Sequence, residues 1–270
     1  MHIQAAPTAK GKVYLVGAGP GDPGLLTLEA ATLLKTADVI FHDDLVSDEI
    51  LELIPDHIYV ESVGKRCGHA RVSQKQIHAL MINAANEGWK VVRLKSGDPL
   101  VFGRAGEEME ALRQAGIECV VVPGVTAAFA AAAQAGIPLT DRRLASKLIF
   151  LSNHQCEGKS LFDWKGALST NTTALIYMPG ADYSTLAARL CEEGLSLDTP
   201  CLVVSRASTA GQKVHAATIA TLAGAPIYAA PVVLVVGAVA ARYAREYRQE
   251  LNALTFDLNL NEAAEPISGD

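Results

Sequence analysis

The chain has 270 residues, half of them hydrophobic, and its 23 basic and 29 acidic side chains give a formal net charge of −6. That much apolar sequence can bury a large core, which excludes a globally disordered chain. The acidic balance and the lack of a basic run exclude a general nucleic-acid binder, because contact with phosphates needs a positive surface.

The predicted elements of the first half alternate short β-branched runs with helical periodicity. The second helix opens with a capping box formed by Ser73 and Gln76, and Gly88 ends it. The third helix carries acidic side chains in its early turns (Glu107, Glu108 and Glu110), which suits the positive end of its dipole. We predict strands at Lys12–Val16, Val39–Phe41, Val91–Leu94 and Cys119–Val122, and helices at 25–37, 73–88, 105–115 and 125–135.

The second half repeats this alternation after Arg143. Two α/β halves fit the pattern better than one continuous sheet, with a boundary near 137–147. We predict an N-terminal α/β domain (1–143), a C-terminal α/β domain (144–251) and a mobile tail (252–270). The expected strands are Leu148–Leu151, Thr173–Tyr177, Cys201–Val204 and Val232–Val236, and the expected helices are Ser184–Glu193 and Ala238–Glu250.

The cysteines and the apolar stretches indicate a cytoplasmic protein. The five cysteines are odd in number, scattered and without a C-x-x-C pair, which is typical of reduced thiols. Residues 1–10 show no apolar signal-peptide core. The two most apolar stretches, 120–139 and 225–241, are interrupted by Pro or Gly and fall short of the ~20 apolar residues of a membrane span.

Three loops rich in Gly and Pro each follow a predicted strand: Gly17–Asp22, Lys95–Pro99 and Val122–Ala127. In open α/β sheets the ligand crevice lies at the carboxyl ends of the strands, so these loops predict a binding site. The first loop resembles the dinucleotide fingerprint G-x-G-x-x-G, but its sixth position is Asp22 and Pro20 lies inside the turn. A plain strand-to-helix turn would give the same residues.

The sequence contains no motif for a metal site, a serine nucleophile or a P-loop. The chain has no H-E-x-x-H, no ligand spacing among its seven histidines and no G-x-S-x-G elbow. The segment Glu157–Ser160 lacks the leading Gly of a P-loop. We therefore expect neither a dedicated metal nor a serine nucleophile.

Four segments resemble, in order, the motifs of the tetrapyrrole methyltransferases that use S-adenosylmethionine: Val16–Thr27, Val91–Arg104, Val122–Ala128 and Gly136–Arg142. The resemblance covers about Lys12 to Tyr243. Gly64-Lys65-Arg66, together with the second and fourth segments, favours the members that act on uroporphyrinogen III.

The resemblance implies two α/β domains with the cofactor bound in the cleft between them, and a homodimer. It implies methylation of uroporphyrinogen III at C2 and C7 to give precorrin-2 via precorrin-1, with S-adenosylhomocysteine as the other product and no metal. The product would enter sirohaem, cobalamin or haem d1 synthesis. Neither nucleic acid nor membrane is an expected partner.

The resemblance also implies roles for five side chains. Arg104, Glu107 and Arg142 would lie at the macrocycle, whose carboxylates planar Arg side chains can grip bidentately. Asp43 would accept a proton, and Lys65 would donate one. From the residues alone, Arg104 and Glu107 also fit a surface helix pair, and Asp43 fits a cap at a strand end. Asp44 stands where the family usually has Arg.

The cofactor contacts that the resemblance implies come mostly from backbone atoms. Ser96 stands where the family usually has Gly, so a backbone contact there requires a negative φ. Met178 alone would also fit a core filler. The expected contacts are Pro20, Ser96, Gly97, Asp98, Val101, Thr126, Ala127, Met178 and Ala207.

Three alternatives stay open at this point. The first is a methyltransferase for a later corrin precursor. The second is a nucleotide-dependent oxidoreductase, based on the imperfect glycine fingerprint. The third is a tetrapyrrole-binding protein without turnover. The methyltransferase hypothesis requires that the three loops lie together.

Overall fold

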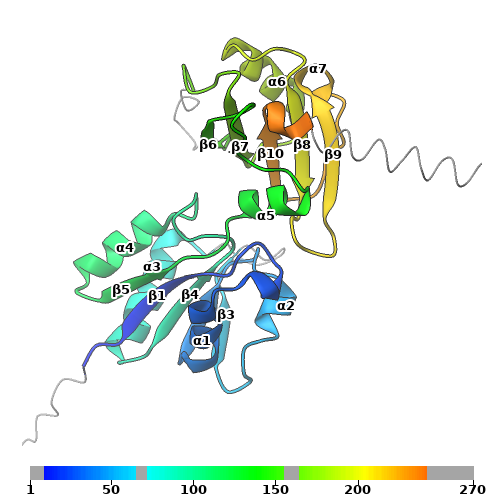
Figure 1. The fold of residues 1–270 in the computed structure, drawn as a ribbon. Coiled ribbons are helices and arrows are strands. Elements are labelled where there is room, and N and C mark those ends of the chain that lie inside the picture. The colour runs from blue at the N-terminus through cyan, green and yellow to red at the C-terminus, as the bar shows by residue number, and fades with distance from the viewer. Residues whose placement is uncertain (1–8, 65–71, 155–163, 242–270) are drawn as a thin grey trace, which may run out of the picture. The chain divides into compact units, whose positions relative to one another are not determined.

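A computed structural model describes residues 9–64, 72–154 and 164–241 (Figure 1). The chain divides into two compact units. The first comprises Met1–Ala130 with Arg206–Gln212, and the second Ala131–Ser205 with Lys213–Asp270. The domain limits predicted from the sequence stay predictions, and the predicted tail 252–270 lies outside the described residues.

The first unit is built on an open sheet in which every strand pair is parallel, in the order β3-β2-β4-β1-β5. β2 and β4 are buried along their whole length, as expected for a parallel sheet covered on both faces. The strands are β1 (Lys12–Gly17), β2 (Val39–His42), β3 (Tyr59–Ser62), β4 (Val91–Lys95) and β5 (Glu118–Val122).

Helices cover both faces of this sheet (Figure 1). One core cluster contains side chains of α1 (Leu28–Thr36) and α2 (Asp48–Leu51). The other contains side chains of α3 (Gln74–Asn86) and α4 (Ala105–Gln114). α5 (Ala127–Gln134) follows β5. The side chains of β4 therefore alternate between the two cores, which decides where its charged residues point.

The helix starts show where local sequence reasoning held and where it was wrong. The capping box of α3 is confirmed, with Ser73 and Gln76 bonded reciprocally. The first helix was predicted from Leu25 but begins at Leu28, because the Thr27 hydroxyl accepts from the Ala30 N–H and caps it there. Pro23–Leu25 instead forms a separate 3-10 turn, η1.

The second unit has a mixed sheet in the order β6-β7-β10-β8-β9, in which β6 and β7 are parallel and the other pairs antiparallel. It packs around one core that includes Trp164, Leu186 and Leu234. Its elements are β6 (Lys147–Ser152), β7 (Thr172–Tyr177), α6 (Tyr183–Glu192), β8 (Pro200–Ser205), β9 (Lys213–Thr218), α7 (Ile219–Leu222) and β10 (Val232–Val236).

The four strands predicted for this unit are confirmed within about one residue, but β9 was missed. β9 is an edge strand of half-buried residues with two alanines, so it lacks the β-branched run that marks the others. The helix predicted at 238–250 begins as a 3-10 turn, η2 (Ala238–Ala240), and its remainder from 242 lies outside the described residues.

Among the residues described, no helix is both long and apolar enough to cross a membrane.

Candidate functional site

Three loops of the first unit lie against one another at the carboxyl ends of β1, β4 and β5. The Gly97 N–H donates to the carbonyl oxygen of Gly19 (2.7 Å), and the Gly19 N–H donates back to that of Gly97 (3.1 Å). The Gly124 N–H donates to the carboxylate of Asp98 (3.0 Å). The structure thus brings together the three loops that the sequence singled out.

The loops can approach this closely because glycine, which has no side chain, stands at the points of contact. A Cβ on Gly17 would lie 2.6 Å from the Cα of Gly124, and one on Gly124 would lie 2.3 Å from the carbonyl oxygen of Gly97. These glycines therefore serve the packing of loop on loop, besides any approach of a ligand. Gly97 has φ +71°, whereas Ser96 is not among the residues with positive φ. The backbone conformation of Ser96 therefore allows the backbone contact with the cofactor that was expected there.

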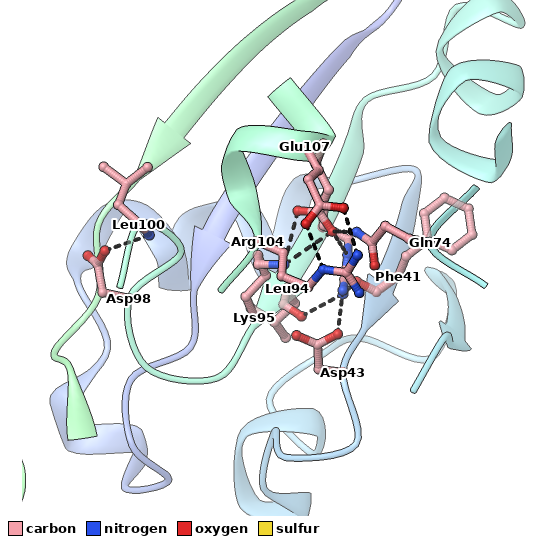
Figure 2. A network of polar contacts seen from close by, with 11 residues as sticks. Phe41, Asp43, Gln74, Leu94, Lys95, Asp98, Leu100, Arg104 and Glu107 are labelled. Carbon is pink, nitrogen blue, oxygen red and sulfur yellow. Dashed lines mark hydrogen bonds and ion pairs between the residues drawn. The ribbon is translucent and has the colours of Figure 1, made fainter. Parts of the chain in front are cut away.

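Asp98 holds the second and third loops together. Its carboxylate accepts from the N–H of Leu100 (2.8 Å) within its own loop and from the N–H of Gly124 across the site. Figure 2 shows the contact with Leu100 at the end of the β4 loop. Both carboxylate oxygens thus have a backbone partner, so this side chain shapes the loops.

The first loop departs from a dinucleotide-binding turn. In that turn the helix starts directly at the glycines and presents its N-terminus to a diphosphate. Here α1 begins only at Leu28, after η1, and Asp22 lies between. The Asp22 carboxylate caps η1 by accepting from the Gly24 N–H. A negative side chain at this point disfavours a diphosphate, and with it the oxidoreductase hypothesis.

Residues other than glycine adopt left-handed backbone in the segments that follow three of the strands. Phe102 and Arg104 follow β4 with φ of 52° and 58°, Met178 follows β7 with φ 50°, and Arg206 and Ser208 flank Ala207 after β8 with φ of 48° and 60°. Such a conformation costs roughly 1–2 kcal/mol for an L-residue, and strain of this kind clusters at functional sites.

Arg104 and Glu107 form a bidentate ion pair at the start of α4, with N–O distances of 2.8 and 2.6 Å. The side chains are 55% and 51% exposed. Hydrogen bonds from Arg104 lower the pKa of Glu107 below its ordinary value. Both groups can therefore meet a ligand from solvent, although this geometry alone also fits a surface pair.

Behind this pair lies a buried ion cluster: Arg93 and Lys95 of β4, Glu108 of α4, and Asp43, which follows β2. Arg93 donates to Glu108 (3.1 Å) and to the carboxylate of Asp43. The Lys95 ammonium lies 3.1 and 3.0 Å from the two oxygens of Glu108. Burial is the main reason that the pKa of Lys95 is lowered.

The burial of Glu108 was not predicted from the sequence. Glu108 lies in the first turn of α4, as expected from the acidic start of this helix, but its side chain is fully buried. Two cations at alternate positions of a buried strand need a buried countercharge, and α4 packs on that face of β4. Arg93 and Lys95 in an otherwise apolar strand were the sequence signal that could have predicted this cluster.

The remaining predicted residues are placed as follows. Thr126 and Ala127, at the start of α5, lie next to Gly97. Met178 is exposed at the end of β7, and Ala207 is buried in the loop grouped with the first unit. Arg142 is exposed on a turn closed by hydrogen bonds between Asp141 and Ala145. Pro20 is buried and Val101 half-buried. Lys65 lies outside the described residues.

Asp44 is exposed and accepts a hydrogen bond from Ser62 (3.3 Å). The charge that departs from the family pattern therefore sits at the surface, one residue after Asp43.

No group of His, Cys, Asp and Glu that could hold a metal ion is found within the described ranges.

The fold and the three packed loops define an α/β protein of the class that binds ligands at the carboxyl ends of a parallel sheet. Residues 12–223 match the family of tetrapyrrole (corrin/porphyrin) methylases. The chain belongs to this family.

Individual relatives are similar over most of this chain. A uroporphyrinogen-III C-methyltransferase of Paracoccus denitrificans is 48% identical over 236 residues, which are 86% of this chain and 82% of the relative. The crystal structure of a Thermus thermophilus uroporphyrin-III C-methyltransferase complexed with S-adenosylhomocysteine has a TM-score of 0.74 and 39% identity, covering 85% of this chain and 98% of that one.

Some relatives are longer than the matched region. Siroheme synthase 2 of Aeromonas hydrophila is 44% identical over 241 residues, which are 88% of this chain but only 51% of that protein. The match to this relative therefore concerns half of its length.

Proposed function

We propose that this chain is an S-adenosylmethionine-dependent methyltransferase that methylates uroporphyrinogen III at C2 and C7 and yields precorrin-2 via precorrin-1. The 48% identity to the Paracoccus enzyme, over most of both chains, carries the proposal. The packed loops and the exposed Arg104–Glu107 pair beside the ion cluster support it from the structure.

The loops fit a cationic cofactor. The three loops contain two acidic side chains, Asp22 and Asp98, and one basic side chain, Lys95, whose ammonium is buried and paired with Glu108. A sulfonium cation would meet no repulsion there, whereas a diphosphate would. When bound, S-adenosylmethionine supplies the methyl group in activated form. We propose that it is held by Pro20, Ser96, Gly97, Asp98, Val101, Thr126, Ala127, Met178 and Ala207.

For the substrate we propose that Arg104 and Arg142 bind carboxylates and that Glu107 orients Arg104. Bidentate guanidinium–carboxylate contacts hold a planar polyanion in one orientation, and alignment of the reacting atoms supplies much of the acceleration. Methylation of a pyrrole carbon makes the macrocycle cationic, so a proton must then leave. We assign its acceptance to Asp43 and a proton donor role to Lys65.

The test is anaerobic incubation of the chain with uroporphyrinogen III and S-adenosylmethionine, followed by mass spectrometry of the tetrapyrrole. Two methyl increments and matching S-adenosylhomocysteine release are expected. A tetrapyrrole of unchanged mass would refute the proposal. Methylation of a later corrin precursor, with uroporphyrinogen III left unchanged, would place the chain elsewhere in the family.

We further propose a cytoplasmic homodimer that serves sirohaem, cobalamin or haem d1 synthesis. Free thiols at Cys119, Cys191 and Cys201 suit a reducing compartment. Light scattering on the purified chain tests the dimer, and a monomeric mass at micromolar concentration would contradict it.

A further inference from the structure

The buried ion cluster holds two positive and two negative side chains, but it is unevenly exposed. Arg93, Lys95 and Glu108 are each at most 3% exposed and together carry a net charge of +1. Asp43 supplies the missing negative charge, and 33% of its side chain is exposed. The cluster therefore reaches solvent at Asp43.

Stability alone does not account for this cluster. Burying an ion costs several kcal/mol, and apolar side chains of similar volume in place of a buried ion pair are often as stable or more so. β4 is otherwise apolar and packs against the apolar core of α3 and α4. Met or Leu would continue that core, so the charges point to a role in the site.

The hydrogen bonds of the cluster connect β4 to α4 and to β2, and α4 to α3. Glu108, one residue after Glu107 in the first turn of α4, accepts from Arg93, from Lys95 and from Gln74 of α3 (3.2 Å). Arg93 in turn donates to the carbonyl oxygen of Phe41 in β2 (3.3 Å), as well as to Asp43. Figure 2 shows Asp43 and Gln74 in this network, with Arg104 and Glu107 beside it.

Lys95 also supports the left-handed bend that carries Arg104. Its Cε would lie 3.2 Å from a Cβ built on Gly103, so the lysine stem fills the space under residues 102–104. The bend, the first turn of α4 and the end of β2 thus share one buried support.

We propose that Arg93 and Glu108 are positioning residues for methyl transfer: they fix Asp43 relative to the Arg104–Glu107 pair, and thereby the macrocycle relative to both. The inference rests on the proposed function. The hydrogen bonds that join the cofactor loops use no side chain of the cluster: Gly19 and Gly97 bond through backbone atoms, Gly124 donates to Asp98, and Lys95 takes part only through its carbonyl oxygen, which accepts from the Ala18 N–H (2.7 Å). Disturbing the cluster should therefore impair turnover without loss of cofactor affinity.

The first experiment replaces Glu108 by Gln, which keeps the shape and removes the charge. A misplacement of about 1 Å can cost up to about a hundredfold in rate, so we expect kcat for uroporphyrinogen III to fall at least about tenfold, with S-adenosylhomocysteine affinity kept within about twofold. Glu110→Gln is the matched control, because Glu110 lies on the same helix and pairs with Arg113 in solvent. Its kcat should equal that of the wild type.

A second variant separates positioning from stability: Arg93→Met, Lys95→Met and Glu108→Leu combined. We expect a melting temperature at or above that of the wild type, retained S-adenosylhomocysteine binding and methylation at least about tenfold slower. Wild-type methylation in either variant would overturn the proposal, and so would equal losses of kcat and cofactor affinity in Glu108→Gln. If the triple variant does not fold, the result for Glu108→Gln alone decides whether the positioning proposal stands.

Wild-type turnover is measured before any variant is compared. Its absence refutes the proposed function, whereas the positioning inference fails only through variants of a working enzyme.

Discussion

Replacing Gly124 by Ala should separate the three loops and weaken cofactor binding. The new Cβ would lie 2.3 Å from the carbonyl oxygen of Gly97 and 2.8 Å from the Cα of Gly17. Both neighbours are backbone atoms, so no side-chain rotation relieves the clash. The third loop must instead move by about 1 Å to reach ordinary van der Waals distance.

Two losses set the size of the effect. Overpacking of this kind costs roughly 1–3 kcal/mol. The movement also stretches the hydrogen bond of 3.0 Å from the Gly124 N–H to the Asp98 carboxylate. A hydrogen bond to a charged group contributes about 1.5–3 kcal/mol. Since the two losses overlap, we expect a net loss of about 2–3 kcal/mol, which corresponds to a fall in melting temperature of about 4–12 °C.

Scanning calorimetry and titration with S-adenosylhomocysteine measure the two consequences. Affinity should fall at least about tenfold, because tenfold corresponds to only about 1.4 kcal/mol. Gly224→Ala is the control, since its Cβ would meet only the carbonyl oxygen of Thr221 at 3.6 Å, an ordinary contact. If Gly124→Ala melts and binds like the wild type, the three loops do not act as one packed cradle.

Three further predictions follow from the placement of single residues. Arg104→Ala should lower methylation strongly but leave S-adenosylhomocysteine affinity and melting temperature nearly unchanged, because its pair with Glu107 is exposed. An equal loss of cofactor affinity would show that Arg104 contacts the cofactor and not the tetrapyrrole. Ser96→Gly should not improve binding of S-adenosylhomocysteine by calorimetry, since the φ of Ser96 is not positive and there is no strain to relieve; a gain would contradict this. Burial raises the pKa of Cys201, which is buried, to about 12 and that of Cys119, which is half-buried, to about 11. Both thiols therefore stay protonated at pH values well below these, and Cys201 should resist iodoacetamide in the folded chain but not in urea, as read by peptide mass mapping, with Cys119 reacting more slowly in the folded chain than in urea. Labelling of Cys201 in the folded chain would refute its burial.

Most of the strands and the meeting of the loops were predictable because they depend on local patterns, whereas β3 and β9 were not predicted. β10 (Val232–Val236) matches its prediction residue for residue, since five consecutive β-branched or leucine residues leave little ambiguity. The loops after β1, β4 and β5 had to come together once their strands were parallel neighbours, and β1 lies between β4 and β5. Short-range pattern and sheet topology thus sufficed to predict that the three loops meet.

The ion cluster was missed because it depends on tertiary packing. In the sequence, Glu108 stands between Glu107 and Glu110, and all three fit the acidic early turns of this helix equally well. The structure distinguishes them by the helix face: Glu107 and Glu110 pair with Arg104 and Arg113 in solvent, while Glu108 turns toward β4. Only the direction in which α4 packs decides which carboxylate is buried.

Backbone strain locates functional residues that composition hides. Sequence reasoning assigns left-handed positions to Gly, Asn and Asp, so Phe102, Arg104 and Met178 give no such signal. These residues nevertheless have positive φ in the segments that follow buried strands, Met178 directly after β7 and the other two in the loop between β4 and α4, and two of them were proposed, on other grounds, to contact substrate or cofactor. Because each position costs roughly 1–2 kcal/mol that a glycine would avoid, we infer that the side chains themselves have a role there. The same reasoning extends to Phe102, which has no role assigned by motif and lies between the cofactor loop and Arg104.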